Sequence, residues 1–305
     1  MYLNFYNLKK GPFHITPDPE FLFLSPSHKE ALASIIYGIK KRKGFVVIIG
    51  EVGVGKTTIL RSYLEWVNKQ RLKIIYIFNS NVSFKGLLNT IYQELGLEIK
   101  MDNVFEMVKH LYRVLIEEYK QGNNVVLVID EAQNMPIKTL ENLRMLSNLE
   151  TSKDKLLQIV LIGQPEFEEI LNLNELRQLK QRIAVRSTIS SFTEEESIAY
   201  IKHRLAKVSM NHHTPVFTQK ALTRVVKQAK GIPRIINILC DNALITGFGY
   251  QKKPIDLKIV NEVIADFEGN GKFLFMRWLL APIDGLRDKI QIFSESLRSP
   301  SGQRD

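Results

Sequence analysis

The chain has 305 residues, of which 45% are hydrophobic and 24% are charged, proportions that fit a globular protein with one large domain or two moderate ones. Its single cysteine, Cys240, excludes an intramolecular disulfide framework and fits a reducing compartment such as the cytoplasm. The net charge of +10 is compatible with nucleic acid, an anionic membrane surface or an acidic protein as partner, and it does not choose among them.

Residues 1–43 precede the first predicted strand and form an aromatic arm followed by a helix. Residues 1–11 lack the basic segment and apolar run of a secretory signal. A helical pattern runs from about His28 to Lys43. Aromatic residues around prolines are typical of an arm packed on the protein core, and we prefer that interpretation to a peptide-binding site. The aromatic residues concerned are Phe5, Phe13, Phe21 and Phe23.

Strands and helices alternate over residues 44–191. A helical pattern with regular apolar spacing covers Val104–Tyr119. Several strands, such as the run VVLVI, are apolar on both faces, which predicts a parallel sheet covered by helices on each side. The fold class is therefore α/β, with a doubly wound parallel sheet. The predicted strands are Phe45–Ile49, Ile74–Phe78, Val125–Ile129, Leu156–Ile162 and a weaker one at Ala184–Ile189.

A phosphate-binding loop follows the first strand, where the sequence GEVGVGKT fills the pattern G-x-x-x-x-G-K-[ST]. Such a loop wraps a polyphosphate because its backbone N–H groups point inward and the next helix presents its positive N-terminus. We expect Lys56 to reach the β- and γ-phosphates and the Thr57 hydroxyl to bind Mg²⁺. The predicted nucleotide-binding residues of the loop are Gly50, Glu51, Val52, Gly53, Val54, Gly55, Lys56, Thr57 and Thr58.

Two adjacent carboxylates, Asp130 and Glu131, end the strand Val125–Ile129. A strand beside the phosphate-binding loop delivers such side chains to the phosphates at the carboxyl edge of the sheet. We expect Asp130 to hold Mg²⁺ through water and Glu131 to polarise the attacking water as general base. The pair argues against a small-molecule kinase, which needs no carboxylate to activate water.

Further candidates flank the last two strands of this region. Gln164 follows the strand Leu156–Ile162, and two interpretations stay open: a side chain that senses the γ-phosphate or orients water, or a plain turn residue. Arg177, Arg182 and Arg186 cluster around the final strand. An arginine presented to the nucleotide of a neighbouring subunit stabilises charge in phosphoryl transfer, and Arg182 is our choice for that role.

After Phe192 the strands stop, and residues 192–268 are predicted to form a small all-helical domain. Thr193 and Glu196 match a capping box at its start. Arg234 stands in a first helical turn, where the macrodipole disfavours a cation, so we prefer pairing with an anion such as the γ-phosphate to an exposed, solvated arginine. The predicted helices are Glu194–Val208, Thr218–Lys230, Pro233–Gly247 and Asp256–Phe267.

Residues 269–305 form a C-terminal tail. Its most apolar part, Phe273–Ile283, is too short for a membrane span and is interrupted by Arg277, so no transmembrane segment is expected. An amphipathic helix here packs on its own domain or on a neighbour, which we prefer, or lies on an anionic membrane.

Taken together, these motifs resemble the AAA+ ATPases, and within them the ExeA-type family of general secretion pathway protein A. The likeness covers roughly residues 1–268 and includes GEVGVGKTT, VIDEAQNM, LLQIVLIGQPEF, LRQLKQRI and GIPRIINILCDNAL. The resemblance implies a P-loop AAA+ core with a helical lid, and the acid pair as the Walker B residues. It also implies Gln164 as sensor 1, Arg182 as the trans arginine finger and Arg234 as sensor 2.

Two functional hypotheses remain, both with ATP and Mg²⁺ as cofactors. The leading one is a cytoplasmic ATPase that forms a homo-oligomeric ring or filament and binds ATP at subunit interfaces. Its hydrolysis would drive assembly of a secretion, pilus or envelope machine, with peripheral contact to the inner membrane. The alternative is an ATP-dependent regulator that oligomerises on duplex DNA, as the related transposition ATPases do.

Overall fold

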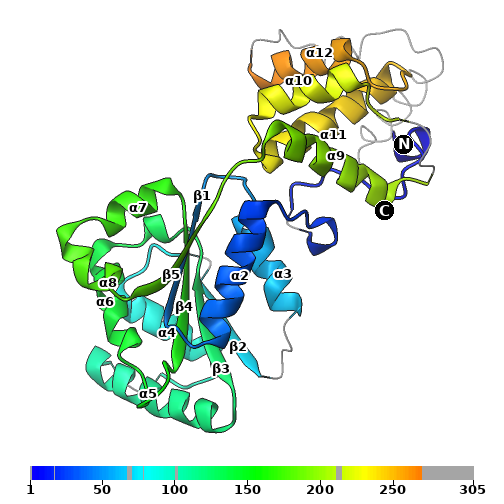
Figure 1. Cartoon of the computed structure of the whole chain (residues 1–305). Helices are drawn as coiled ribbons and strands as arrows, with labels where there is room; N and C mark the ends of the chain where they lie inside the picture. Colours follow the sequence, from blue (N-terminus) through cyan, green and yellow to red (C-terminus); the bar gives the residue numbers. More distant parts are fainter. Residues whose placement is uncertain are drawn as a thin grey trace, which may run out of the picture.

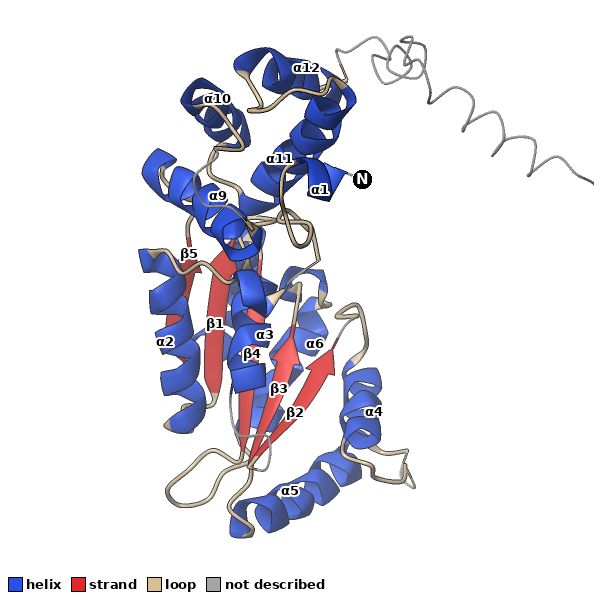
Figure 2. Ribbon diagram, turned by 90° about the vertical axis from the view of Figure 1, so that its right-hand side faces the viewer, coloured by secondary structure: helices blue, strands red, loops and turns tan. Residues whose placement is uncertain are grey.

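A computed structural model describes residues 2–16, 18–66, 71–77, 79–99, 102–210 and 215–269. We name three parts of it: the arm (residues 2–25), the core (residues 26–191) and the lid (residues 192–269). Figure 1 shows the sheet of the core with helices on both sides and the lid beyond one end of it. In Figure 2 the arrowheads of the strands point toward the lid, so the lid lies at the carboxyl edge of the sheet.

The core is built on a parallel five-stranded sheet with the strand order β2-β3-β4-β1-β5. All residues of β1 and β4 are buried, as expected for inner strands with helices on both faces. The edge strand β5 alternates between exposed and less exposed positions, which explains its weaker sequence signal. The predicted doubly wound parallel sheet is confirmed. The strands are β1 Phe45–Gly50, β2 Leu72–Ile77, β3 Asn124–Ile129, β4 Leu157–Gly163 and β5 Ile183–Ile189.

Two apolar clusters lie on opposite faces of the sheet because successive strand residues point to opposite sides. Helices α2 (Pro26–Lys40) and α3 (Lys56–Trp66) pack on one face. The helix predicted to reach Lys43 ends at Lys40, because Arg42 turns the chain with a left-handed φ of 49°. The other face is covered by α4 Phe84–Glu94, α5 Val104–Lys120, α6 Ile137–Ser147, α7 Pro165–Leu171 and α8 Arg177–Lys180.

The described residues of the lid form four helices that surround one apolar cluster. The capping box predicted at Thr193 and Glu196 is present. Each of the four predicted helices is found, with ends within about two residues of the prediction. They are α9 Glu194–Val208, α10 Gln219–Ala229, α11 Pro233–Gly249 and α12 Leu257–Phe267. The tail from residue 270 onward lies outside the described residues. Among the residues that are described, no helix has both the length and the apolar character needed to cross a bilayer.

The arm packs chiefly on the lid, which corrects the expectation that it packs on the core. Its helix α1 (Tyr2–Phe5) lies against α11, and the aromatic side chains of Phe13 and Phe21 belong to the buried cluster of the lid. The guanidinium of Arg204 lies 4.5 Å from the centroid of the Phe21 ring. The arm also continues through the short 3-10 helix η1 (Pro19–Phe21), which contacts both α3 and α9 and so bridges core and lid.

Candidate nucleotide-binding site

The phosphate-binding loop turns sharply between β1 and α3, and its glycines occupy positions closed to other residues. Gly53 and Gly55 have left-handed φ values of 82° and 103°. A Cβ atom on Gly50 would lie 2.8 Å from the Ile189 carbonyl oxygen, and one on Gly53 would lie 2.7 Å from the Cβ of Arg234. The loop is therefore wedged between the sheet and the start of α11.

Lys56 is buried inside this loop, with 6% of its surface exposed. Its Nζ donates hydrogen bonds to the carbonyl oxygens of Gly50 at 2.7 Å and Glu51 at 2.9 Å. Burial lowers the pKa of Lys56, and the charges of Glu131 and Asp130 oppose that shift by stabilising the ammonium. The lysine of the loop and the two acids that follow β3 therefore lie close enough to interact.

Thr57 and Asp130 converge at the carboxyl edge of the sheet. The Thr57 hydroxyl donates to Asp130 Oδ2 at 2.9 Å, so two hard oxygen ligands lie together, as Mg²⁺ prefers. Asp130 Oδ1 accepts the backbone N–H of Glu131 at 3.0 Å. A further donor, the Tyr76 hydroxyl, reaches Asp130 Oδ2 at 2.8 Å. Sequence reasoning missed Tyr76, although a polar hydroxyl near the end of a mainly apolar strand was an available signal.

Glu131 is held by two glutamine amides. Its Oε2 accepts hydrogen bonds from Gln133 Nε2 at 2.6 Å and from Gln164 Nε2 at 2.8 Å. Burial alone would raise the pKa of Glu131, but these two amides, with the charges of Lys56 and Arg234, bring it below its usual value. Gln164 therefore contacts the predicted base. Gln133 was not predicted, since nothing in the sequence tells which way its side chain points.

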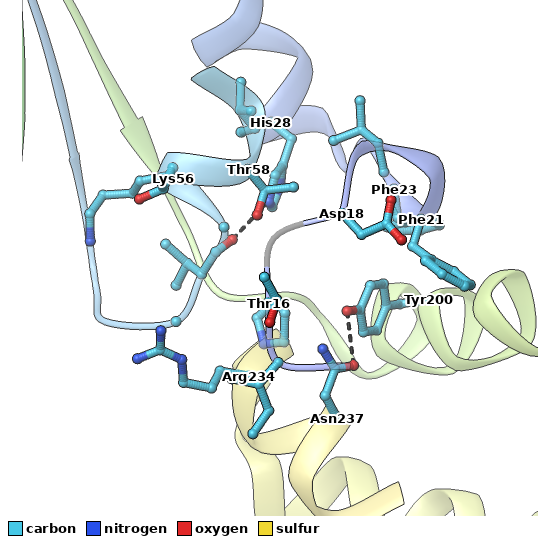
Figure 3. A pocket seen from close by; sticks show the side chains of 18 of the residues that line it. Thr16, Asp18, Phe21, Phe23, His28, Lys56, Thr58, Tyr200, Arg234 and Asn237 are labelled. Carbon is cyan, nitrogen blue, oxygen red and sulfur yellow. Dashed lines mark hydrogen bonds between the residues drawn. The ribbon is translucent and has the colours of Figure 1, made fainter. Parts of the chain in front are cut away.

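A cavity opens beside the loop, with walls from all three parts of the molecule. Figure 3 shows Thr16 and Asp18 of the arm, Lys56 of the loop and Arg234 of the lid around it. The backbone N–H of Arg234 donates to the Gly53 carbonyl at 3.2 Å, which ties α11 to the loop. On the lid side, the Tyr200 hydroxyl donates to Asn237 Oδ1 at 3.0 Å, and Asn237 Nδ2 donates to the His14 carbonyl of the arm at 3.3 Å.

His28 supports the loop from behind. Its Nε2–H donates to the Val54 carbonyl at 2.9 Å, and since a carbonyl only accepts, its Nδ1 accepts from the Ser25 hydroxyl at 2.6 Å. The ring also contacts that of Phe192, with 5.2 Å between centroids. Burial lowers the pKa of His28, which favours this neutral form. A lone histidine early in a helix carried no sequence signal for this role.

The three candidate arginines lie away from the cavity of their own chain. Arg182 Nη1 donates to the Arg144 carbonyl at the end of α6 at 3.1 Å and to two neighbouring side chains. Arg186 forms an ion pair of 3.0 Å with Glu168 of α7, and Arg177 is exposed on α8.

Comparison with known proteins agrees with this geometry. A family model described as AAA domain matches residues 39–171, which include the loop and the acid pair. General secretion pathway protein A of Aeromonas hydrophila is 41% identical over 249 residues, which cover 81% of this chain. Residues 39–171 therefore form an AAA domain. The chain spans 45% of the length of the Aeromonas protein.

Several solved structures have a fold similar to that of this chain. The ORC1 protein of Aeropyrum pernix, solved in complex with DNA, superposes with a TM-score of 0.60 at 16% identity, covering 85% of this chain and 70% of that one. The ORC2 protein of the same organism, in ADPNP–ADP complexes, gives a TM-score of 0.59 at 14% identity, with 82% and 72% covered. At these identities the likeness concerns the fold alone.

Proposed function

We propose that this chain binds Mg²⁺-ATP in the cavity between loop, arm and lid, and hydrolyses it. The observation that carries the proposal is the convergence of the motifs: Thr57 Oγ1 lies 2.9 Å from Asp130 Oδ2, and Lys56 lies within electrostatic reach of both acids. A phosphate-binding loop alone suits many phosphate ligands. With a metal-binding acid and a second carboxylate beside it, the site suits a triphosphate and an attacking water.

Each motif residue then has a distinct task. The loop N–H groups and the Lys56 ammonium bind the phosphates, and Thr57 with Asp130 holds Mg²⁺, which neutralises charge on the phosphate oxygens when bound. The Glu131 carboxylate accepts a proton from water as the water oxygen attacks the γ-phosphorus. The bond to the bridging oxygen breaks, and its electron pair leaves with ADP.

Gln164 and Arg234 would report the state of the nucleotide to the rest of the chain. Gln164 touches Glu131 from the end of β4, so a shift of either residue moves the other. Arg234 stands at the start of α11, which is bonded to the loop through the Gly53 carbonyl. We infer that residues 44–191 and 192–268 act as two domains that close on the nucleotide.

The oligomer is the second part of the proposal. Arg182 would reach the nucleotide of a neighbouring subunit as an arginine finger, with Arg177 and Arg186 as the alternatives. None of the three lines the cavity of its own chain, which supports a role in trans. For Arg182, such a role requires its guanidinium to exchange its hydrogen bonds to the Arg144 carbonyl and to two neighbouring side chains for bonds to phosphate.

A mixed-subunit experiment tests this arrangement. When Arg182→Ala chains are mixed with Glu131→Gln chains in equal amounts, Mg²⁺-dependent ATP hydrolysis should recover to about a quarter of the wild-type rate, because a site with an intact Glu131 can then receive Arg182 from its neighbour. Phosphate release across the mixing series is the measurement. No recovery in the mixture would contradict the role in trans, and no hydrolysis by the wild-type chain would contradict the ATPase itself.

The similarity to General secretion pathway protein A supports assembly or remodelling of a secretion, pilus or envelope machine as the use of this hydrolysis. We infer a cytoplasmic location, with the protein peripheral to the inner membrane, where such a machine is reached.

A second candidate, ATP-dependent binding to duplex DNA, is favoured by the surface of α10. This helix carries Lys220, Arg224 and Lys227 at a spacing that places them on one side, and it contains no acidic residue. Lys220 and Lys227 are exposed. Such a basic stripe suits the phosphate backbone of DNA. The ORC1 protein of similar fold was solved with DNA.

For this candidate, we expect the protein to retard random duplex DNA in a mobility-shift assay with a slowly hydrolysed ATP analogue, less so as salt rises. The double variant Lys220→Glu/Lys227→Glu should weaken this binding several-fold. Lys138→Glu, an equally exposed site on α6 of the core, is the control for added negative charge. Absence of any shift at low salt would exclude the candidate.

A further inference from the structure

A tyrosine outside the nucleotide-binding motifs holds the carboxylate of Asp130. The Tyr76 hydroxyl donates to Asp130 Oδ2 at 2.8 Å, the same oxygen that accepts the Thr57 hydroxyl at 2.9 Å. The other oxygen, Oδ1, accepts the backbone N–H of Glu131 at 3.0 Å. Both oxygens of this carboxylate therefore have defined partners. One of the three donors, the Tyr76 hydroxyl, comes from β2, which contains neither the phosphate-binding loop nor the acid pair.

The register of the sheet places Tyr76 at this point. Strand β2 runs parallel to β3, and Tyr76 pairs with Val128, two residues before Asp130. Asp130 directly follows β3, and its carboxylate accepts the hydroxyl of Thr57 on α3, so it lies on the same side of the sheet as Val128. The ring of Tyr76 packs against the apolar cluster of that face, beneath α2 and α3, and this packing aims its hydroxyl at the carboxylate.

We propose that Tyr76 is a positioning residue that sets the affinity of the site for the divalent cation accompanying the nucleotide, an inference that rests on the proposed function. The reason is that the two hydroxyl donors to Asp130 Oδ2 have different roles. Thr57 must present its oxygen to the metal, whereas the Tyr76 hydroxyl is held on β2 and orients Asp130. Partners that orient a metal-binding carboxylate typically change metal affinity by 10- to 100-fold when removed, and we expect a loss of about tenfold.

The test compares Tyr76→Phe with Tyr119→Phe. The first removes only the hydroxyl that reaches Asp130. The second removes a hydroxyl that donates to Asp154 Oδ2, also at 2.8 Å, near the amino end of β3 and far from the cavity. Mn²⁺ binding to the complex with a non-hydrolysable ATP analogue is followed by electron paramagnetic resonance, and ADP affinity is measured separately in EDTA.

We expect the dissociation constant for Mn²⁺ to rise about tenfold in Tyr76→Phe and to stay at the wild-type value in Tyr119→Phe. ADP affinity without metal should be equal in all three proteins. An unchanged Mn²⁺ constant in Tyr76→Phe, or an equal loss of metal-free ADP affinity, would overturn the inference. Failure of the wild-type chain to bind the nucleotide analogue would instead overturn the proposed function, so the two failures are distinguishable.

Discussion

Replacement of Glu131 by glutamine is expected to lower the turnover of ATP by about 10²- to 10³-fold while ATP binding persists. The amide keeps the size of the side chain, and its oxygen can still accept the hydrogen bonds from Gln133 and Gln164. An amide cannot take a proton from water, so the hydrolysis step slows while ATP binding is unchanged. Single-turnover phosphate release and titration with a fluorescent ATP analogue measure the two quantities.

The matched control is Glu117→Gln, the same substitution at an exposed position of α5 that pairs with Lys120. It should hydrolyse ATP at the wild-type rate. Unchanged turnover in Glu131→Gln would remove this residue as the base. A parallel loss of ATP binding would show that the carboxylate supports the structure of the site instead of its chemistry.

Much of the fold could be predicted from local pattern. The inner strands are apolar along their whole length because helices cover both faces, and this signal does not depend on which strands are neighbours. The lid helices could be predicted equally well, because Thr193 and Glu196 form a capping box at the first of them and Pro233 is the first residue of the third. The loop motif and the acid pair were recognisable because their chemistry requires particular residues at particular spacings.

What could not be predicted depends on contacts between distant segments. Tyr76 reaches Asp130 only because β2 lies next to β3, a strand order that no local pattern specifies. Gln133 bonds to Glu131 because the chain enters a left-handed conformation at that acid, with φ of 50°. The arm was assigned to the core for a similar reason. Phe13 and Phe21 are apolar enough to pack on either the core or the lid, and in the structure they belong to the apolar cluster of the lid.

The junction of core and lid depends on one glycine, and Gly231→Ala should lower the free energy of unfolding by about 2–4 kcal/mol. Gly231 has a left-handed φ of 75°, a conformation that costs other residues about 1 kcal/mol. In addition, a Cβ atom here would lie 2.0 Å from the Phe192 carbonyl oxygen, so backbone must move, at a further cost of about 1–3 kcal/mol. Urea unfolding followed by circular dichroism measures the loss.

Gly96→Ala separates the two contributions. Gly96 also has a left-handed φ, of 69°, but no atom of the described residues lies within 4 Å of the Cβ it would gain, so its variant should lose only about 1 kcal/mol. The clash at Gly231 should also weaken ATP binding, because Phe192 donates its N–H to the Gly231 carbonyl at 2.8 Å and contacts His28 behind the loop. Equal destabilisation of the two variants, with ATP affinity intact in both, would mean that the lid is not joined to the nucleotide site through this contact.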